Sequence, residues 1–472
     1  MAVFAPKWIL FIIVSFGMFT TTLEGTIVLI LYPVITDFFN TNPSTTAWIG
    51  IGYFLTSCSL LMTMGWLCDL WGGKKVYIYG IIIFTINLSL ISFSQNVYQI
   101  IFLRSLQGIG AAMVIASSTA LLASQFSKEE RGKAFGFSGA VVGLGLGLGP
   151  LLGGVLIELL DWKAVFYSRV PLSILCILLS TKIINQNIPK HHIKLDLLGS
   201  LYLFILLGSL LFFISQVNLL GLFSPLILVS ILMFATSIPF FIYQERRSEF
   251  PVVQIQMFNN PVFCVSIITL ILIYQSWSAI GYITPFITTY GMGYSIVISG
   301  FLLSIFSLIR VAVAPIAGWA TDKIGSKILI FFSVVLLLIS LILLGFATMY
   351  GKALSISLVL GLASIAFALF DPSNNTAVVN SVPQDRLGMA SASIATARQT
   401  GLAIGIALSS AIFSERLANY SESPVKSLII ENLDPEYILH AARDTILLST
   451  IVCAFTLIVF IFWKKVPADI QS

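Results

Sequence analysis

The chain of 472 residues is 58% hydrophobic and 10% charged with a formal net charge of +5, and its mean hydropathy is +0.99. Average soluble domains carry about 25% charged residues, so this composition excludes a soluble enzyme. The lipid bilayer is the expected solvent for most of the chain.

Apolar stretches long enough to cross about 30 Å of hydrocarbon recur along the whole sequence. Fourteen spans of about 22 residues take up roughly 300 residues and leave no room for a soluble domain. The sequence therefore predicts an all-α polytopic membrane protein. The predicted spans are residues 8–32, 46–67, 76–94, 98–124, 134–157, 163–181, 196–215, 223–243, 263–286, 295–317, 328–347, 354–379, 388–413 and 443–463.

The 25 Lys and Arg residues are distributed unevenly between the two sides of these spans. Sixteen lie on the side of Lys7, five lie on the other side, and four lie inside spans. Loops rich in Lys and Arg stay in the cytoplasm, so we expect a cell-membrane protein with both termini cytoplasmic. The positive net charge then reflects topology, and no basic patch with interleaved aromatic residues predicts a nucleic-acid partner.

Two polar stretches connect the predicted spans at length. The Pro-containing residues 185–196 are a candidate linker on the cytoplasmic side. Residues 414–444 fall outside and carry several acids, and we expect a solvated loop or a short surface helix there, with receptor binding as the alternative.

Neither the cysteines nor the histidines predict a metal site or a cofactor. The five cysteines stand singly in or beside apolar segments and form no C-x-x-C pair. His191, His192 and His440 lie in polar connections without metal-ligand spacing. The sequence also lacks a Walker-type nucleotide loop, so the proton gradient is the expected energy source. No nucleophile–base or metal constellation is present, so no enzymatic activity is expected.

A ten-residue pattern occurs twice. Residues 65–74 (GWLCDLWGGK) and 318–327 (GWATDKIGSK) agree at five of ten positions with an offset of 253. Such a repeat predicts two related six-helix bundles, at residues 1–184 and 263–472, with a substrate site at their interface. Residues 185–262 then hold the linker and two extra central helices.

Four segments together resemble the major facilitator superfamily, and within it the fourteen-span drug:proton antiporter family. They are LEGTIVLILYP at 23–33, GWLCDLWGGKK at 65–75, RSLQGIG at 104–110 and GLGLGPLLGG at 145–154. Glu24 replaces the usual Asp of the first segment, and Arg169 stands where the family has Asn. The resemblance also implies a monomer in a prokaryotic membrane, with a small-molecule substrate and protons as partners.

The resemblance assigns two further roles to motif residues. Gating of the cytoplasmic side would involve Gly65, Asp69, Gly72, Lys74 and Asp322. The exchange of substrate for protons would involve a small-residue helix with a bend, formed by Gly145, Gly149, Pro150, Gly153 and Gly154.

Ionisable side chains inside spans are costly and indicate functional sites. Glu24, Asp371 and, by resemblance, Arg104 are predicted to couple transport to protons. Three structural alternatives remain. Glu24 could only neutralise a nearby arginine, Arg104 could only bond backbone carbonyls, and Asp371 could cap a helix that breaks at Pro372.

Aromatic and polar residues inside the spans are candidates for substrate binding, although aromatic residues also gather at membrane interfaces. The candidates are Tyr53, Gln107, Tyr274, Gln275, Trp277, Arg310, Asn375 and Arg398. The predicted function is a proton-coupled, alternating-access exporter of small lipophilic or cationic compounds, of the multidrug type associated with antibiotic resistance. The alternatives are an exporter of an organic anion or zwitterion, or a lipid-handling or sensor protein.

Overall fold

The computed structural model describes residues 6–126, 128–183, 196–249, 251–350, 352–383, 386–425 and 430–461, and no strand occurs in these ranges. Both chain ends, His191, His192 and nearly all of the expected linker at 185–196 lie outside the described residues. Within the described part, fourteen helices are long and apolar enough to cross a membrane. The predicted all-α fold with fourteen spans is confirmed.

The α-helices and the short 3-10 or π helices (η) have these bounds in chain order: α1 (Pro6–Ile27), η1 (Val28–Ile30), α2 (Leu31–Phe38), α3 (Pro43–Thr46), α4 (Trp48–Trp71), α5 (Gly73–Ile91), α6 (Val97–Gln125), α7 (Lys128–Leu159), α8 (Ala164–Tyr167), α9 (Val170–Ile183), α10 (Leu197–Leu220), α11 (Pro225–Arg247), η2 (Ile255–Asn259), α12 (Pro261–Phe286), η3 (Ile287–Gly291), α13 (Ile296–Ile324), α14 (Ser326–Tyr350), α15 (Ala353–Asn380), α16 (Leu387–Tyr420), η6 (Ile430–Asn432) and α17 (Pro435–Ile461).

The stretch at residues 414–444, expected to be a solvated loop or a short surface helix, is in large part a continuation of the two spans that it connects. Helix α16 continues to Tyr420 and α17 begins at Pro435, so most of that stretch is helical. The Tyr420 hydroxyl donates to Asp444 Oδ2 at 2.9 Å and joins the two projecting helix ends. Polar residues are compatible with a helix that extends past the hydrocarbon, because its backbone bonds are made within the helix.

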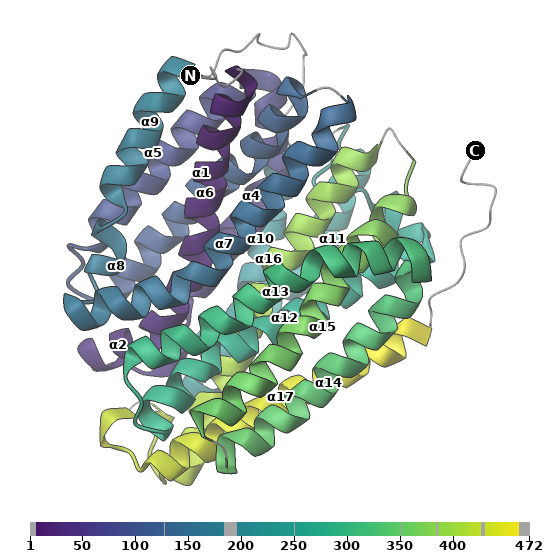
Figure 1. Ribbon diagram of the computed structural model, residues 1–472. Helices are drawn as coiled ribbons and strands as arrows, with labels where there is room; N and C mark the ends of the chain where they lie inside the picture. The colour runs from purple at the N-terminus through teal and green to yellow at the C-terminus, as the bar shows by residue number, and fades with distance from the viewer. Residues whose placement is uncertain are drawn as a thin grey trace.

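The fourteen long helices form two six-helix bundles and an inserted pair. The N-terminal half (α1–α9) and the C-terminal half (α12–α17) lie side by side, drawn from purple to blue and from green to yellow in Figure 1. Between them in the chain, α10 packs against one helix of each half, α4 and α16, and α11 packs on α10. We call the two ends of the bundle the Asn42 end and the Gly72 end, after the loops that they carry.

The repeated ten-residue pattern has the same structure in both halves. Gly72 ends α4 with φ 87°, and Gly325, at the offset of 253 in the sequence, ends α13 with φ 92°. A positive φ is unfavourable for residues with a Cβ, so each copy needs glycine at its helix C-terminus. The repeat thus marks the same helix-ending turn in both halves.

Helix α7 is in close contact with one helix of each half, α1 and α13. A Cβ on Gly149 would lie 2.2 Å from Thr26 Oγ1 of α1, and a Cβ on Gly154 would lie 2.8 Å from the Ile296 carbonyl oxygen of α13. On α13, a Cβ on Gly300 would lie 2.4 Å from the carbonyl oxygen of Pro150. Glycines on two faces of α7 therefore allow this helix to join the halves at backbone distance.

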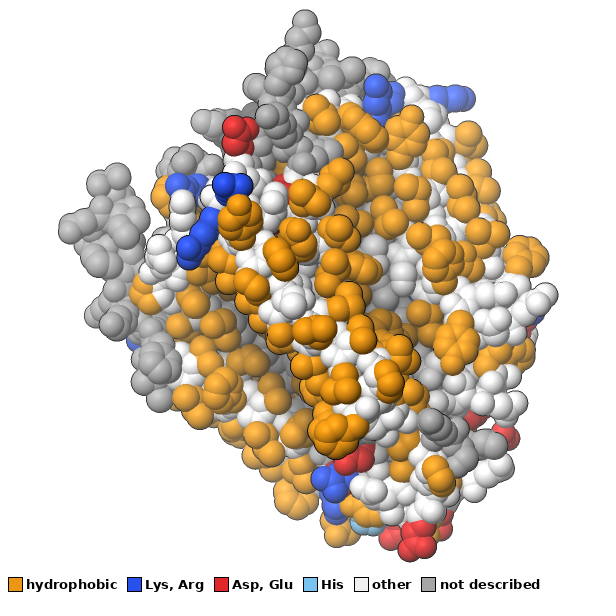
Figure 2. All heavy atoms as spheres, turned by 180° about the vertical axis from the view of Figure 1, so that it is seen from behind, with side chains coloured by type: hydrophobic (Ala, Val, Ile, Leu, Met, Phe, Trp, Pro, Cys, Tyr) orange, Lys and Arg blue, Asp and Glu red, His pale blue; other side chains and the backbone are white. Residues whose placement is uncertain are grey.

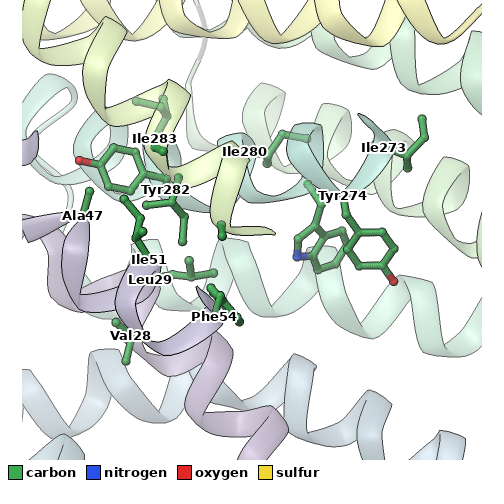
Figure 3. Close-up of a cluster of buried hydrophobic side chains, with 14 of the residues drawn as sticks. Val28, Leu29, Ala47, Ile51, Phe54, Ile273, Tyr274, Ile280, Tyr282 and Ile283 are labelled. Atoms are coloured by element: carbon green, nitrogen blue, oxygen red, sulfur yellow. The ribbon is translucent and has the colours of Figure 1, made fainter. Parts of the chain in front are cut away.

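The halves close against each other at the Asn42 end. Tyr282 donates to the Pro43 carbonyl at 2.9 Å, and its ring lies 4.9 Å from that of Tyr32. Ser44 and Ser414 form a second link at 2.9 Å. Figure 3 shows side chains of η1 and α4 meeting those of α12 in one buried hydrophobic cluster that includes both halves.

The inserted helix α10 also bonds to both halves at this end. Ser215 accepts from Trp48 Nε1 of α4 at 3.1 Å, and Asn218 donates to Glu415 Oε2 of α16 at 2.9 Å. A separation of α4 from α16 here would break one of these contacts.

The outer surface has the character of a membrane protein. Figure 2 shows a broad hydrophobic band, with Lys and Arg side chains mainly at its upper edge and most Asp and Glu side chains at its lower edge. Helix α11 is the most exposed span, because only 17% of its most apolar 18-residue stretch is buried inside the protein. Its apolar side chains face outward, as expected where lipid rather than water is the surrounding solvent.

Substitution of Gly300 tests the close contact of α7 and α13. Gly300→Ala places a methyl group against the Pro150 carbonyl, and overpacking of this kind costs about 1–3 kcal/mol. Gly318→Ala on the same helix meets no atom within 4 Å and should be neutral or slightly stabilising. Thermal melting of the detergent-purified variants should show a loss of stability for Gly300→Ala alone, and equal melting of both would contradict the contact.

Candidate functional site

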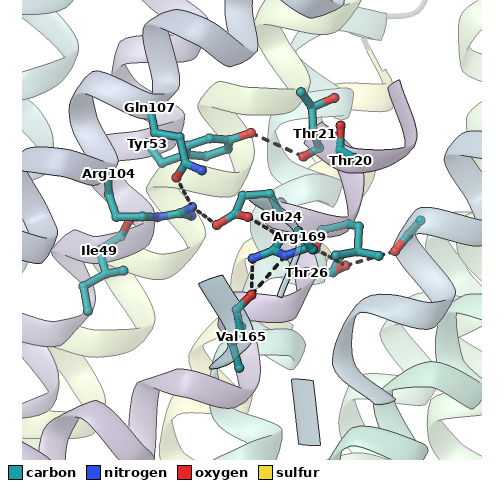
Figure 4. Close-up of polar contacts among 12 residues, drawn as sticks. Thr20, Thr21, Glu24, Thr26, Ile49, Tyr53, Arg104, Gln107, Val165 and Arg169 are labelled. Carbon is teal, nitrogen blue, oxygen red and sulfur yellow. Dashed lines mark hydrogen bonds and ion pairs between the residues drawn. The ribbon is translucent and has the colours of Figure 1, made fainter. Parts of the chain in front are cut away.

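An ion cluster lies inside the N-terminal half. Glu24 of α1 is completely buried, and each of its carboxylate oxygens accepts from a different guanidinium group. Arg104 of α6 contacts Oε1, and Arg169, just before α9, contacts Oε2. Figure 4 shows the carboxylate between the two arginines.

Neighbouring groups hold both arginines in place. Arg104 donates to the Ile49 carbonyl at 3.2 Å and to Gln107 Oε1 at 2.7 Å, and its guanidinium lies 4.4 Å from the ring centre of Tyr53. Arg169 donates through Nε to the Val165 carbonyl at 3.0 Å. With two guanidinium groups on one carboxylate, the cluster keeps a formal charge of +1.

A second ion pair lies in the C-terminal half. Asp371 of α15 contacts Arg310 of α13 and accepts from the Tyr274 hydroxyl of α12 at 3.0 Å. Helix α15 continues from Ala353 to Asn380 through Pro372, so the alternative that Asp371 caps a broken helix is wrong. The carboxylate instead links three helices of this half.

Between the two ion clusters lies a cavity of about 250 Å³. Its wall combines threonines and apolar residues of α1 with aromatic, arginine and amide side chains of the C-terminal half. The lining residues are Met18, Thr21, Thr22, Gly25, Thr26, Leu29, Tyr53, Phe54, Ile115, Val142, Leu146, Tyr274, Trp277, Ser278, Gly281, Arg310, Ala395, Arg398, Gln399 and Leu402.

The cavity wall carries positive charge and aromatic rings. Arg310 lies 4.7 Å from the Trp277 ring, and Arg398 lies 5.2 Å from the Tyr274 ring. Arg310 is paired with Asp371, whereas Arg398 makes no ion pair among the described residues and its Nε has no hydrogen-bond partner. The buried Gln399 Oε1 is also without a partner. These groups offer a donor with positive charge and an acceptor to a bound molecule.

Most of the predicted substrate residues lie on this wall: Tyr53, Tyr274, Trp277, Arg310 and Arg398. The remaining three lie outside it. Gln107 bonds to Arg104, and Gln275 is within 3.4 Å of Ser449. Asn375 is half-buried on α15, away from the lining residues.

Arg169 is the residue of the ion cluster that was not among the predicted coupling residues. Its position where the family has Asn, inside an apolar segment, was the available signal, but the sequence did not reveal which acid it contacts.

The structure also shows that Arg104 both bonds a backbone carbonyl and pairs with Glu24. The ion pair of Glu24 with Arg104 is therefore the contact expected for a structural role and also the contact that proton coupling would use.

The predicted gating residues lie at the Gly72 end. Asp69 and Asp322 are exposed near the ends of α4 and α13. Lys74, at the start of α5, donates to the Thr181 carbonyl of α9 at 2.9 Å. Gly65 stands where an added Cβ would meet no atom within 4 Å.

The predicted exchange motif has a local structure that explains its small residues. Cβ atoms on Gly145 and Gly153 would lie 3.0 Å from the Phe19 carbonyl oxygen and 2.9 Å from Ile27 Cγ1, both on α1. Pro150 lies within the continuous helix α7, and the next backbone N–H, of Leu151, donates to Ser304 of α13 at 3.0 Å. The motif is thus the packing surface of α7 for its two neighbours.

The paired bundles around a central cavity fit a membrane transporter, and the family match and the curated relatives show this class rather than an enzyme. A sequence model of the Major Facilitator Superfamily matches residues 14–406. The chain belongs to the Major Facilitator Superfamily, as the four sequence motifs predicted.

Several curated proteins are similar over most of the chain. The riboflavin transporter RibZ of Clostridioides difficile is 27% identical over 465 residues, or 97% of this chain and 98% of the relative. The multidrug resistance protein Stp of Mycobacterium tuberculosis is 25% identical and covers 85% of this chain and 75% of its own length. The multidrug transporter protein MdtP of Bacillus subtilis is 27% identical, with 85% and 74% covered. These relatives fit the fourteen-span drug:proton antiporter family.

Solved structures share the fold at low sequence identity. A bacterial homologue of the human lysosomal transporter Spinster, crystallised in an inward-facing and unoccupied conformation, gives a TM-score of 0.68 at 11% identity and covers 98% of this chain and 100% of that one. The nucleoside transporter NupG gives 0.66 at 12% identity, with 98% and 100% covered. At such identities the likeness concerns the fold alone.

Glu24→Gln tests the ion cluster. The substitution keeps the size of the side chain but leaves two buried guanidinium groups without their countercharge, which costs about 3–5 kcal/mol. We expect a lower melting temperature in detergent and poorer expression, whereas Glu158→Gln at an exposed position should melt as the unmodified protein does.

A double substitution separates charge from shape. Combining Glu24→Gln with Arg169→Asn removes one stranded cation, so it should recover part of the lost stability. A Glu24→Gln protein that melts normally would show that the cluster does not stabilise the fold.

Proposed function

We propose that this transporter exports small planar aromatic compounds, neutral or negatively charged, in exchange for protons. This proposal rests on the composition of the cavity wall. The wall combines two arginines with three aromatic rings, namely Arg310, Arg398, Tyr53, Tyr274 and Trp277. None of the described residues that line it has a carboxylate side chain. Arginine planes and aromatic rings suit flat π-systems, and an unpaired guanidinium suits a carbonyl or carboxylate oxygen.

The charge of the site favours this substrate class over lipophilic cations. Arg398 makes no ion pair with any residue that the structure describes, and the cluster at Glu24 carries a formal +1 next to the cavity residue Tyr53. A bound cation would face two uncompensated positive charges in a medium of low dielectric constant. The alternative of an organic anion or zwitterion, raised by the sequence, thus has the better structural support.

The relatives support small aromatic substrates as a class. RibZ is named as a riboflavin transporter, and Stp and MdtP as multidrug proteins. Riboflavin is a flat three-ring compound with a polar side chain and no charge near neutral pH, so it matches the proposed class and is a suitable first probe.

Proton coupling is proposed from the Glu24 cluster. A proton that binds either oxygen of this carboxylate competes with the guanidinium group on that oxygen, so proton binding would release Arg104 or Arg169 to another partner. Asp371 with Arg310 is the corresponding arrangement at the opposite cavity wall. We propose Glu24, Arg104 and Asp371 as coupling residues, with Gly65, Asp69, Gly72, Lys74 and Asp322 in the gate.

We further propose that the Gly72 end faces the cytoplasm, with both termini on that side. The basic side chains at one edge of the hydrophobic band and the acidic side chains at the other support this orientation. Closure at the Asn42 end would then make the structure inward-facing. In alternating access, the bundles at residues 1–184 and 263–472 would rock around the cavity, with residues 185–262 as an insertion.

A transport assay tests the function. Proteoliposomes with an imposed pH gradient are offered riboflavin, a planar aromatic carboxylate and a lipophilic aromatic cation of similar size. We expect gradient-dependent accumulation of the first two. Preferred accumulation of the cation would contradict the proposed substrate class, binding without flux would identify a sensor, and movement of labelled phospholipid would identify a lipid transporter.

Arg398→Gln tests the residue that should set this preference. Loss of a charged hydrogen-bond donor costs about 1.5–3 kcal/mol, which corresponds to a KM for the carboxylate at least about 10-fold higher. Arg416→Gln on the same helix, 51% exposed, is the matched control. An unchanged KM for Arg398→Gln would remove this arginine from the binding site.

Cysteine labelling tests the orientation. A cysteine introduced at Ser423, beyond α16, should react with an impermeant thiol reagent from outside intact cells. A cysteine at Gln186, which lies outside the described residues, should react only after the membrane is opened. Labelling of both positions from the same side would contradict the proposed topology.

A further inference from the structure

Two carboxylates are buried together at the base of the inserted helix pair. Asp196 is the N-cap of α10 and Glu245 lies in the last turn of α11, and they are 6% and 5% exposed. They belong to the α10–α11 insertion and lie outside the cavity wall. Neither residue is used in the proposed transport mechanism.

One oxygen of each carboxylate has ordinary hydrogen bonds. Asp196 Oδ1 accepts from the backbone N–H of Gly199 at 2.7 Å and from Gln244 Nε2 at 2.9 Å. Glu245 Oε2 accepts from the backbone N–H of Val253 at 2.8 Å. These bonds join the start of α10, the end of α11 and the segment that leads to α12.

The other oxygen of each carboxylate has no partner, and the two point to the same place. Asp196 Oδ2 and Glu245 Oε1 are buried without a hydrogen bond. Both lie 2.8 Å from the position that a Cβ on Gly199 would occupy. The glycine leaves the space in which these oxygens converge.

No described cation neutralises the pair, because no ion pair among the described residues includes either acid. Helix α10 carries no charged residue. The charged residues on this side of the other elements that pack against α10 are Asp69 on α4, Arg246 and Arg247 on α11, Glu249 after it, and Arg386 at the start of α16. The remaining charged residues of α16 lie further along that helix: Arg398 lines the cavity, and Glu415, followed by Arg416, contacts Asn218 near the other end of α10.

We propose that Asp196 and Glu245 form a proton-binding site in which one proton is shared between Asp196 Oδ2 and Glu245 Oε1. Two buried carboxylates that face each other cannot both be ionised without a large repulsion, and one shared proton turns this repulsion into a short, charge-assisted hydrogen bond. Two free oxygens are too few for Ca²⁺, which takes six to eight oxygen ligands. The site holds the two ends of the insertion together when it is protonated.

This site makes the stability of the protein depend on pH. In the unfolded chain, separate carboxyl groups lose their protons above about pH 4. The folded pair retains one proton beyond that point, so the native state binds more protons than the unfolded state and stability falls as the pH rises. Glu245→Gln replaces the proton with an amide that donates to Asp196, so it should remove this part of the pH dependence.

Thermal melting of the full-length protein in detergent, from about pH 6 to about pH 8, tests the proposal. We expect the melting temperature of the unmodified protein to fall as the pH rises over this range. In Glu245→Gln the fall over the same range should be smaller by at least about 2 °C. Asp196→Asn, which keeps the capping oxygen, should act in the same way. Glu249→Gln, at an exposed acid four residues further on, should show the same fall in melting temperature as the unmodified protein. The proposal would be overturned if Glu245→Gln and Asp196→Asn also showed that same fall.

Infrared spectroscopy gives a readout that does not depend on how well a variant folds. The unmodified protein at about pH 8 should retain the carbonyl band of a protonated carboxyl group, and this band should be missing from Glu245→Gln and Asp196→Asn. An identical band in all three proteins would overturn the proposal. So would a rise in melting temperature of the unmodified protein on replacing choline by Na⁺ or Ca²⁺, because the site would then bind a metal ion.

Discussion

A charge inside hydrocarbon needs a countercharge or a polar cavity, and this constraint organises the centre of the transporter. Glu24 joins α1 to α6 through Arg104 and to the start of α9 through Arg169, while Asp371 joins three helices of the other half. Each half is thereby tied together by a carboxylate near the cavity, fully buried at Glu24 and partly buried at Asp371. Because the arginines outnumber the acids, the region around the cavity has an excess of positive charge, and the proposed substrate preference rests on this excess.

Close backbone contact between helices is the second feature on which the structure depends, because it is how the two halves pack against each other. Glycines on α7 and Gly300 on α13 bring main chains together, and Ser304 satisfies the N–H that follows Pro150. Small residues let these helices approach at backbone distance without interlocking side chains. In the proposed alternating access, this contact is the place about which the two halves would pivot.

The inserted α10 and α11 would constrain the proposed movement of the two halves. Helix α10 holds α4 through Ser215 and α16 through Asn218 at the closed Asn42 end. At the other end of the insertion, the Asp196–Glu245 pair joins its first and last turns to the chain that enters the second bundle. The extra helices are thus bonded to both halves, and in the proposed alternating access they would have to follow both of them.

The sequence by itself determined the fourteen helices, the two-bundle fold and the family, because hydropathy, loop charge and four motifs are local signals that survive without knowledge of contacts. It also identified Glu24, Arg104, Arg310, Asp371 and Arg398 as costly residues inside spans. Only the tertiary structure decided their partners: Arg169 lies 145 residues from Glu24 along the chain, yet contacts the same carboxylate as Arg104. It also decided that Asp371 stands inside a continuous helix and that one free oxygen of Asp196 and one of Glu245 lie beside Gly199. Pairing depends on which helix faces touch, and a nearly all-apolar span carries no periodic pattern that records this.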